Sequence, residues 1–150
     1  MRNTSREKIT SDNAWEFAEC FANLGEKKIA LLTARQAMDS DNWNVRYFAV
    51  AALGRVDSVD AIPTAMECLG VELAYIVAGQ KHTGFDERIY RRLCEILAKR
   101  TKKDFGLDPC AWANWWDTAR VPHFAPALTV DADAAKKAFA EYQTRSKPDR

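Results

Sequence analysis

Tryptophan side chains are the most distinctive candidates for ligand recognition in this chain. Trp112, Trp115 and Trp116 lie at positions i, i+3 and i+4 near the C-terminal end, and Trp43 stands alone. Indole rings can stack on a base or anchor a partner protein. Three on one short helix can equally seal the apolar end of a helical stack. We expect Trp112, Trp115 and Trp116 to be structural, whereas Trp43 is either a packed rim residue or a contact residue.

A basic region forms a second candidate site. It extends from residue 88 to residue 103 and begins with Arg88, Arg91 and Arg92. Such a region could meet the carboxylates of a protein or the phosphates of a nucleic acid. It could also be the solvated face of a helix, with cations near the C-terminal end, where the helix dipole favours them. We place Arg88, Arg91 and Arg92 with Trp43 in a candidate partner-binding surface.

Catalytic and metal chemistry find little support in the sequence. The common nucleotide, hydrolase and zinc-protease motifs are absent, and neither His82 nor His123 has a second ligand at metal spacing. The four cysteines include no C-x-x-C pair; they are Cys20, Cys68, Cys94 and Cys110. We expect the first three to be free thiols buried within helices. We therefore expect no enzymatic activity, no metal and no cofactor.

Composition favours one soluble domain. The 150 residues are 47% hydrophobic and 29% charged, which allows a real hydrophobic core. Lys and Arg number 22 against 21 Asp and Glu, a net charge of +1, whereas duplex DNA and RNA binders usually show a basic excess. No segment approaches about 18 uninterrupted apolar residues, and no signal sequence follows the N-terminus. We expect a cytoplasmic protein without a membrane-bound part.

Helices must position these residues, because apolar side chains recur at helical spacing along most of the chain. The clearest stripe is Val45, Phe48, Ala49, Ala52, Leu53 and Val56. Asp41 or Asn42 can cap its start, and Gly54 lies near its end. The alanines would allow a neighbouring helix to approach closely.

The spacing of apolar residues predicts six or seven helices in all. Besides the one near 43–56, helices are predicted at 12–24, 26–38, 60–78, 86–99, from 109, and at 131–144. Ser11 or Asp12 can cap the first, the fourth is expected to continue through Gly70, and Asp108 followed by Pro109 is a strong start signal. A polar loop is expected at 79–84 and an extended segment at 121–128. Flexible ends at 1–10 and 145–150 would flank a single domain at 11–144.

Two segments resemble HEAT-like repeats. Residues 39–54 read Asp-x-Asp-x-Trp-x-Val-Arg-x-x-Ala-x-x-Ala-Leu-Gly, like the helix pair of such a repeat, and residues 97–116 are similar to the ending of small bacterial HEAT-like proteins. The resemblance implies an all-α fold, a short α-solenoid of antiparallel helix pairs. It also implies a ladder contact between Asp39 or Asp41 and Arg46. Members of the family include scaffolds, adaptors, accessory subunits, immunity proteins and a few DNA glycosylases.

These observations predict a non-catalytic protein–protein interaction module: a scaffold, an accessory subunit or an immunity- or antitoxin-like inhibitor. Its partner would be another protein, with no membrane and no small-molecule substrate evident. The alternative is a nucleic-acid-binding protein such as a DNA glycosylase-type enzyme. Trp43 with Asp39 or Asp41 is the only place where its catalytic acid could lie.

Overall fold

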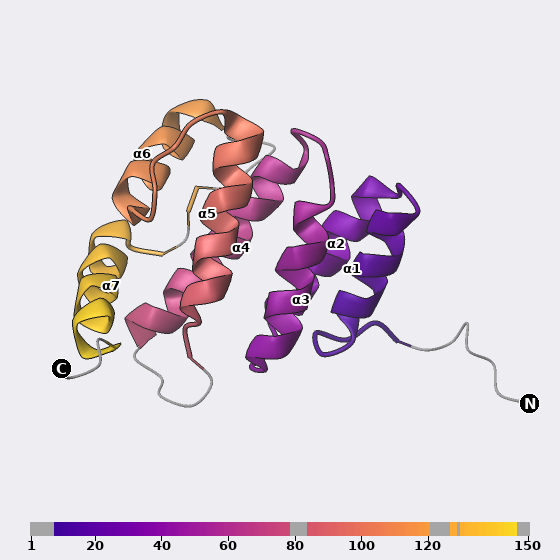
Figure 1. Ribbon diagram of the computed structural model, residues 1–150, viewed down its shortest axis with the longest axis horizontal. Helices are drawn as coiled ribbons and strands as arrows, with labels where there is room; N and C mark the ends of the chain where they lie inside the picture. The colour runs from indigo at the N-terminus through magenta and orange to yellow at the C-terminus, as the bar shows by residue number, and fades with distance from the viewer. Residues whose placement is uncertain (1–7, 79–83, 121–126, 129, 147–150) are drawn as a thin grey trace, which may run out of the picture.

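The computed structural model describes residues 8–78, 84–120, 127–128 and 130–146, and within these ranges all regular structure is helical, with no strand (Figure 1). The helices are α1 (Ala14–Asn23), α2 (Lys27–Ala37), α3 (Trp43–Gly54), α4 (Ala61–Ala78), α5 (Glu87–Thr101), α6 (Pro109–Ala119) and α7 (Ala132–Ser146). The all-α prediction is confirmed. The predicted loop at 79–84 and extended segment at 121–128 fall mostly outside the described residues, as do His82, His123 and most of the two predicted flexible ends.

Capping side chains set the starts of three helices close to where the sequence predicted them. Asn42, Asp86 and Asp108 each accept hydrogen bonds from backbone N–H groups in the first turn of α3, α5 and α6. Pro109 occupies the first turn of α6, where a missing N–H costs nothing. Helix α4 continues through Gly70, which is buried. These ends follow from local sequence because a cap acts within one turn.

Three predicted ends are wrong. Neither Ser11 nor Asp12 caps α1, because the backbone N–H of Thr10 donates to Asn13 Oδ1 at 2.7 Å and that of Asn13 donates to Thr10 Oγ1 at 3.3 Å. This reciprocal pair closes a turn and delays the helix to Ala14. Helix α5 continues past residue 99 to Thr101, and α7 continues to Ser146, so the first two residues of the predicted C-terminal tail are helical.

The helices pack in neighbouring pairs (Figure 1). Helix α2 packs on α3 and α4 on α5; between these pairs, α2 contacts α4 and α3 contacts α5. At one end α1 covers α2 and α3, joined to α2 by a tight turn in which Gly25 has φ +77°, a conformation that favours glycine. At the other end α7 contacts α4 and α6.

The core is continuous through the two pairs. Fully buried side chains include Met66, Leu69 and Leu73 of α4 and Leu93 and Leu97 of α5. Helix α4 is long and apolar enough to cross a membrane by length and composition, with a mean hydropathy of 1.4, and half of it is buried inside this protein.

Helix α3 buries more than the predicted stripe. Val45, Ala49, Ala52, Leu53 and Val56 are buried, but Phe48 is 46% exposed, and Arg46 and Val50 are buried instead. The reason is that α3 contacts α1, α2 and α5, so its buried surface is wider than one face. Phe48 lies at the edge of this surface, with its ring 5.1 Å from that of Trp15 in α1.

Candidate functional site

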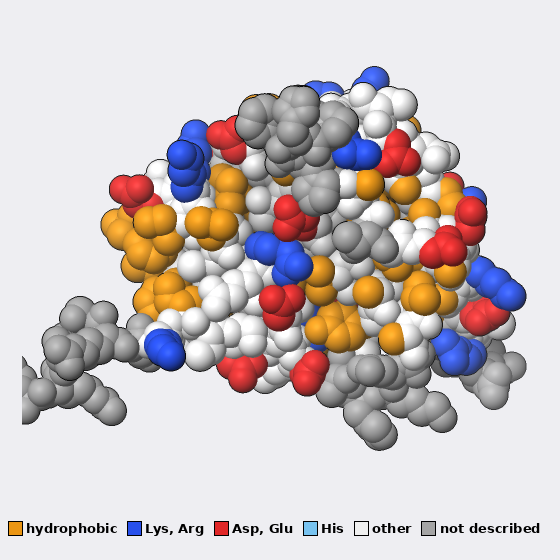
Figure 2. Space-filling view, turned by 180° about the vertical axis from the view of Figure 1, so that it is seen from behind, with side chains coloured by type: hydrophobic (Ala, Val, Ile, Leu, Met, Phe, Trp, Pro, Cys, Tyr) orange, Lys and Arg blue, Asp and Glu red, His pale blue; other side chains and the backbone are white. Residues whose placement is uncertain are grey.

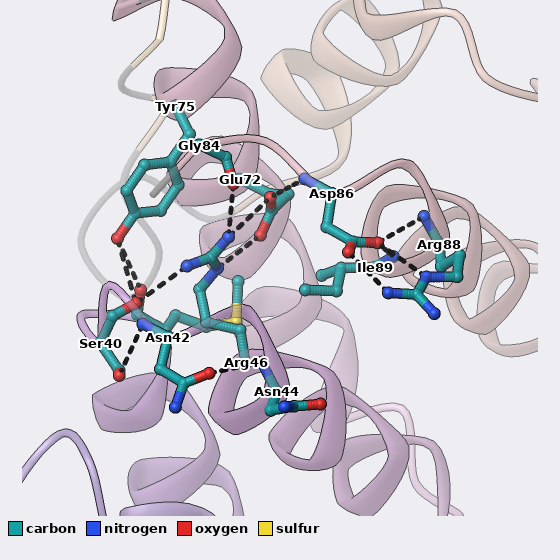
Figure 3. Close-up of polar contacts among 11 residues, drawn as sticks. Ser40, Asn42, Asn44, Arg46, Glu72, Tyr75, Gly84, Asp86, Arg88 and Ile89 are labelled. Atoms are coloured by element: carbon teal, nitrogen blue, oxygen red, sulfur yellow. Dashed lines mark hydrogen bonds and ion pairs between the residues drawn. The ribbon is translucent and has the colours of Figure 1, made fainter. Parts of the chain in front are cut away.

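The site begins with a buried ion pair between α3 and α4. Arg46 and Glu72 side chains are both 0% exposed, with Arg46 Nε 3.0 Å from Glu72 Oε1 and Nη2 3.4 Å from Oε2 (Figure 3). The Arg46 guanidinium lies 4.4 Å from the centre of the Tyr75 ring. Its remaining N–H groups donate to backbone carbonyls, Nη1 to Ser40 at 3.0 Å and Nη2 to Gly84 at 2.8 Å. Every charge is therefore compensated, as burial requires.

This pair corrects the predicted ladder contact. Arg46 is structural, but its carboxylate comes from Glu72 and not from Asp39 or Asp41, which are exposed. Asp39 instead pairs with Arg35 at 3.0 Å. Because the Arg46 side chain points into the core, it can meet only a buried carboxylate on a facing helix. Burial raises the pKa of the Glu72 carboxyl, opposed by Arg46 and by the Asp86 N–H, which donates to Glu72 Oε2 at 2.9 Å.

The pair holds the starts of α3 and α5 together, and a second contact holds their ends. Ser40 precedes α3, while Gly84 and Asp86 precede α5, and all three bond to the Arg46–Glu72 pair. At the far ends, Arg100 Nη2 of α5 donates to the carbonyl of Gly54 at 3.0 Å. A Cβ on Gly54 would lie 3.2 Å from Arg92 Nη2, so the Arg92 side chain of α5 packs against α3 at Gly54. The two helices therefore run in the same direction and are fixed side by side.

A stacked arginine lies on the surface above this pair. Trp43 and Tyr47 are one turn apart on α3, and they are 41% and 39% exposed. The Arg88 guanidinium of α5 lies 4.5 Å from the Trp43 ring centre and 5.7 Å from that of Tyr47. Asp86 accepts from Arg88 Nη2 at 3.0 Å and from Nε at 3.3 Å. Burial favours the neutral form of Asp86, but the hydrogen bonds and charge of Arg88 outweigh it, so the pKa of Asp86 is lowered.

A groove continues from this arginine between the two helices. We name it the α3–α5 groove; it has a volume of about 430 Å³ and is lined by Tyr47, Ala51, Arg88, Arg91, Arg92 and Glu95. Arg91 pairs with Glu87 at 2.9 Å and Arg92 with Glu95 at 3.3 Å. Helix geometry thus brings together Arg88, Arg91 and Arg92, and Arg88 connects them to Trp43. The sequence argument missed Tyr47, although its position four residues after Trp43 on one helix could have revealed it.

The C-terminal tryptophans face the opposite way. Trp112 is fully buried, its Nε1 donates to the carbonyl of Gly106 at 2.9 Å, and the Phe105 ring meets it edge-on at 4.9 Å. Trp116 is 5% exposed, and Trp115 is half-buried with its ring 6.0 Å from that of Trp112. Their inward orientation agrees with a structural assignment.

The thiols divide by burial. Cys68 and Cys94 are buried, and burial raises the pKa of each to about 12, so both are protonated at neutral pH. Cys20 is exposed, contrary to expectation, because α1 buries Ala14 and Ala18 on the other side of the helix. Among the described residues, no three His, Cys, Asp or Glu side chains are placed to hold a metal ion.

The face behind the groove has a different character. There Arg35 pairs with both Asp39 and Glu67, beside a pocket of about 220 Å³ between α2, α4 and α6. Figure 2 shows basic and acidic side chains alternating down the middle of this face, with hydrophobic side chains on both sides of them. Helix α2 also carries two exposed apolar residues, Ile29 and Leu32.

Comparison of the chain with protein-family models, with curated proteins and with solved structures found no match.

Proposed function

We propose that this chain is a non-catalytic protein–protein interaction module built as a short HEAT-like solenoid, serving as a scaffold, an accessory subunit or an immunity- or antitoxin-like inhibitor. The neighbouring pairs α2–α3 and α4–α5 support the solenoid, since like helices of successive pairs contact each other. In such stacks each pair buries its apolar side against the next and leaves one continuous surface for a partner.

One observation carries the proposal: Arg88 lies over the rings of the half-exposed Trp43 and Tyr47, on a surface whose base is fixed by a fully buried ion pair. Tryptophan, tyrosine and arginine dominate the binding energy of protein interfaces. A surface that is already ordered loses little conformational freedom when it binds. The arrangement therefore has both the composition and the rigidity of a protein-binding surface.

The titratable groups near the surface favour binding over catalysis. Asp86 is engaged by Arg88 and by the first turn of α5, and Glu72 is engaged by Arg46 and the Asp86 N–H. The buried thiols Cys68 and Cys94 hold their protons at neutral pH. Asp86 and Glu72 therefore already have structural partners in the free protein, and the protonated thiols are poor nucleophiles.

Partner capture from native extract tests the proposal. The tagged full-length protein should retain one protein in stoichiometric amount, and Trp43→Ala should lose it. Leu32→Ala, which removes a 70% exposed side chain from α2, is the matched control and should retain it. Loss with Leu32→Ala but not with Trp43→Ala would place the surface elsewhere. Nuclease-sensitive nucleic acid as the captured material would support the glycosylase-type alternative.

A further inference from the structure

We infer that the α3–α5 groove recognises a short acidic segment of a partner protein, in which carboxylate side chains stand next to an aromatic or other large apolar side chain. This inference rests on the proposed function and adds the chemistry of the partner.

The groove presents positive charge to solvent. Three guanidinium groups and one carboxylate line it. The side chains of Arg88, Arg91 and Arg92 are 60%, 49% and 50% exposed, whereas their acidic neighbours Asp86 and Glu87 are only 15% and 30% exposed. An approaching segment therefore meets Arg88 and Arg91 before it meets Asp86 and Glu87, whereas Glu95, the partner of Arg92, is itself 66% exposed.

The spacing of the arginines suits carboxylates. Positions i, i+3 and i+4 of one helix lie about 5–6 Å apart on its surface. Each guanidinium can bind a carboxylate through two parallel hydrogen bonds. The pairs Arg91–Glu87 and Arg92–Glu95 are solvent-exposed contacts within one helix, of a kind that contributes little to stability. An incoming carboxylate can therefore replace Glu87 or Glu95 at little cost.

The opposite wall supplies the apolar part of the site. Tyr47 lines the groove from α3, and the ring of Phe48, 46% exposed, lies 5.9 Å from it. Trp15 packs behind Phe48 at 5.1 Å and supports it. A large apolar side chain next to the acidic residues would cover this aromatic ledge and remove it from water.

A nucleic-acid backbone fits the groove less well. Its binding depends on many cations without anionic neighbours. Here each of the three arginines has a carboxylate within 3.3 Å, and the whole chain carries a net charge of only +1.

A random-peptide library displayed on phage tests the inference on the full-length protein. The enriched peptides should share at least two aspartate or glutamate residues close to an aromatic or large aliphatic residue. Fluorescence anisotropy with a labelled enriched peptide should show that Arg91→Glu and Arg92→Glu each weaken binding by about ten-fold or more. Lys99→Glu reverses the same charge on the same helix outside the groove, so it should keep wild-type affinity. Circular dichroism should show equal melting temperatures for the three variants.

Three results would overturn the inference: no enrichment, enrichment of neutral or basic peptides, or equal weakening by Arg91→Glu and Lys99→Glu. Labelled oligothymidine that binds more tightly than the acidic peptide and is lost in Arg91→Glu would assign the groove to nucleic acid. The proposed function can be tested independently of this inference. Capture of a protein partner through Trp43, together with peptide binding that ignores Arg91 and Arg92, would retain the function and reject only the acidic segment.

Discussion

Arg46 carries a full charge where no water reaches it. Its position is tolerated because Glu72, two backbone carbonyls and the Tyr75 ring together replace the lost hydration. Replacing both ionic partners with apolar side chains is often nearly neutral in such pairs, whereas removing one leaves the other uncompensated. A variant that removes only one partner is therefore the best test of the pair, because the other charge stays buried and unpaired.

Glu72→Leu should lower the free energy of unfolding by about 3–5 kcal/mol, because it strands the buried Arg46 cation. Adding Arg46→Met should cost less than the sum of the two single changes, since the stranded charge disappears. Glu67→Leu, which removes a surface carboxylate from the same helix, should change stability by about 1 kcal/mol or less. Urea denaturation of the wild type, the three single variants (Glu72→Leu, Arg46→Met and Glu67→Leu) and the double variant measures these differences. Wild-type stability in Glu72→Leu would contradict this account of the pair.

The sequence predicted that Arg46 is structural but not which acid it meets. Asp39 or Asp41 is the partner that the resemblance to HEAT-like repeats implies, because an Asp before the helix and an Arg early in it form the ladder contact of that family. That pattern does not decide which carboxylate is buried. A usable signal was present: Glu72 lies three residues after Leu69 and four before Ile76, on the buried face of α4. A carboxylate on an apolar face requires a buried cation as partner.

At the scale of the helix, local sequence predicted helix starts best where a capping side chain bonds to the first turn. Asn42 and Asp108 cap α3 and α6 as predicted. Prediction failed where neighbouring helices decide which side chains are buried. Helix α3 contacts three other helices, and their positions bury Arg46 but leave Phe48 exposed. A periodic stripe identifies a helix but not how many neighbours will cover it.

The cap of α6 provides a test at this scale. Asp108→Ala should cost about 1 kcal/mol at neutral pH, because two backbone N–H groups lose their acceptor. Asp108→Asn should cost less, since its side-chain oxygen can still accept. Chemical denaturation of both variants and the wild type measures the difference. Equal losses for alanine and asparagine would show that the cap does not stabilise the helix.

The same carboxylate should give a pH dependence on the acid side. Burial favours its neutral form, but the hydrogen bonds from Lys136 and from the helix backbone outweigh it and lower the pKa of Asp108 below its ordinary 3.8. Its stabilising contribution is therefore complete above that value and is lost as the pH falls through the lowered pKa. The advantage of wild type over Asp108→Asn should shrink over this acid range.

At the scale of the molecule, we expect buried Trp116 to contribute to stability and half-exposed Trp43 to contribute to partner binding. Trp116→Ala should lower the free energy of unfolding by about 3–5 kcal/mol, because it opens a cavity at the closed end of the core. Trp43→Ala should change it by about 0.5 kcal/mol or less, since that ring is 41% exposed, while partner binding is weakened. Thermal unfolding and partner capture measure the two effects. A normally folded Trp116→Ala that loses the partner, with an unaffected Trp43→Ala, would reverse the assignment.

The α3–α5 groove was only partly accessible to sequence reasoning. The residue types of Trp43, Arg88, Arg91 and Arg92 suggested a surface, but their placement on one side depends on how α3 lies against α5. That alignment comes from contacts between residues far apart in the chain, such as Arg100 with Gly54 and Arg46 with Gly84. Helical periodicity carries no information on such contacts.

The buried cation of α3 also determines how the molecule can come apart. Arrays of helix pairs can unfold one pair at a time when each pair is satisfied by its own contacts. Arg46 prevents this here, because its acid lies on α4 and one of its carbonyl acceptors immediately before α5. Separation of α4 and α5 from α3 would break the contacts of Arg46 with Glu72 and Gly84 and would expose the apolar faces that surround them. We therefore expect α3, α4 and α5 to unfold together, across the boundary between the two pairs.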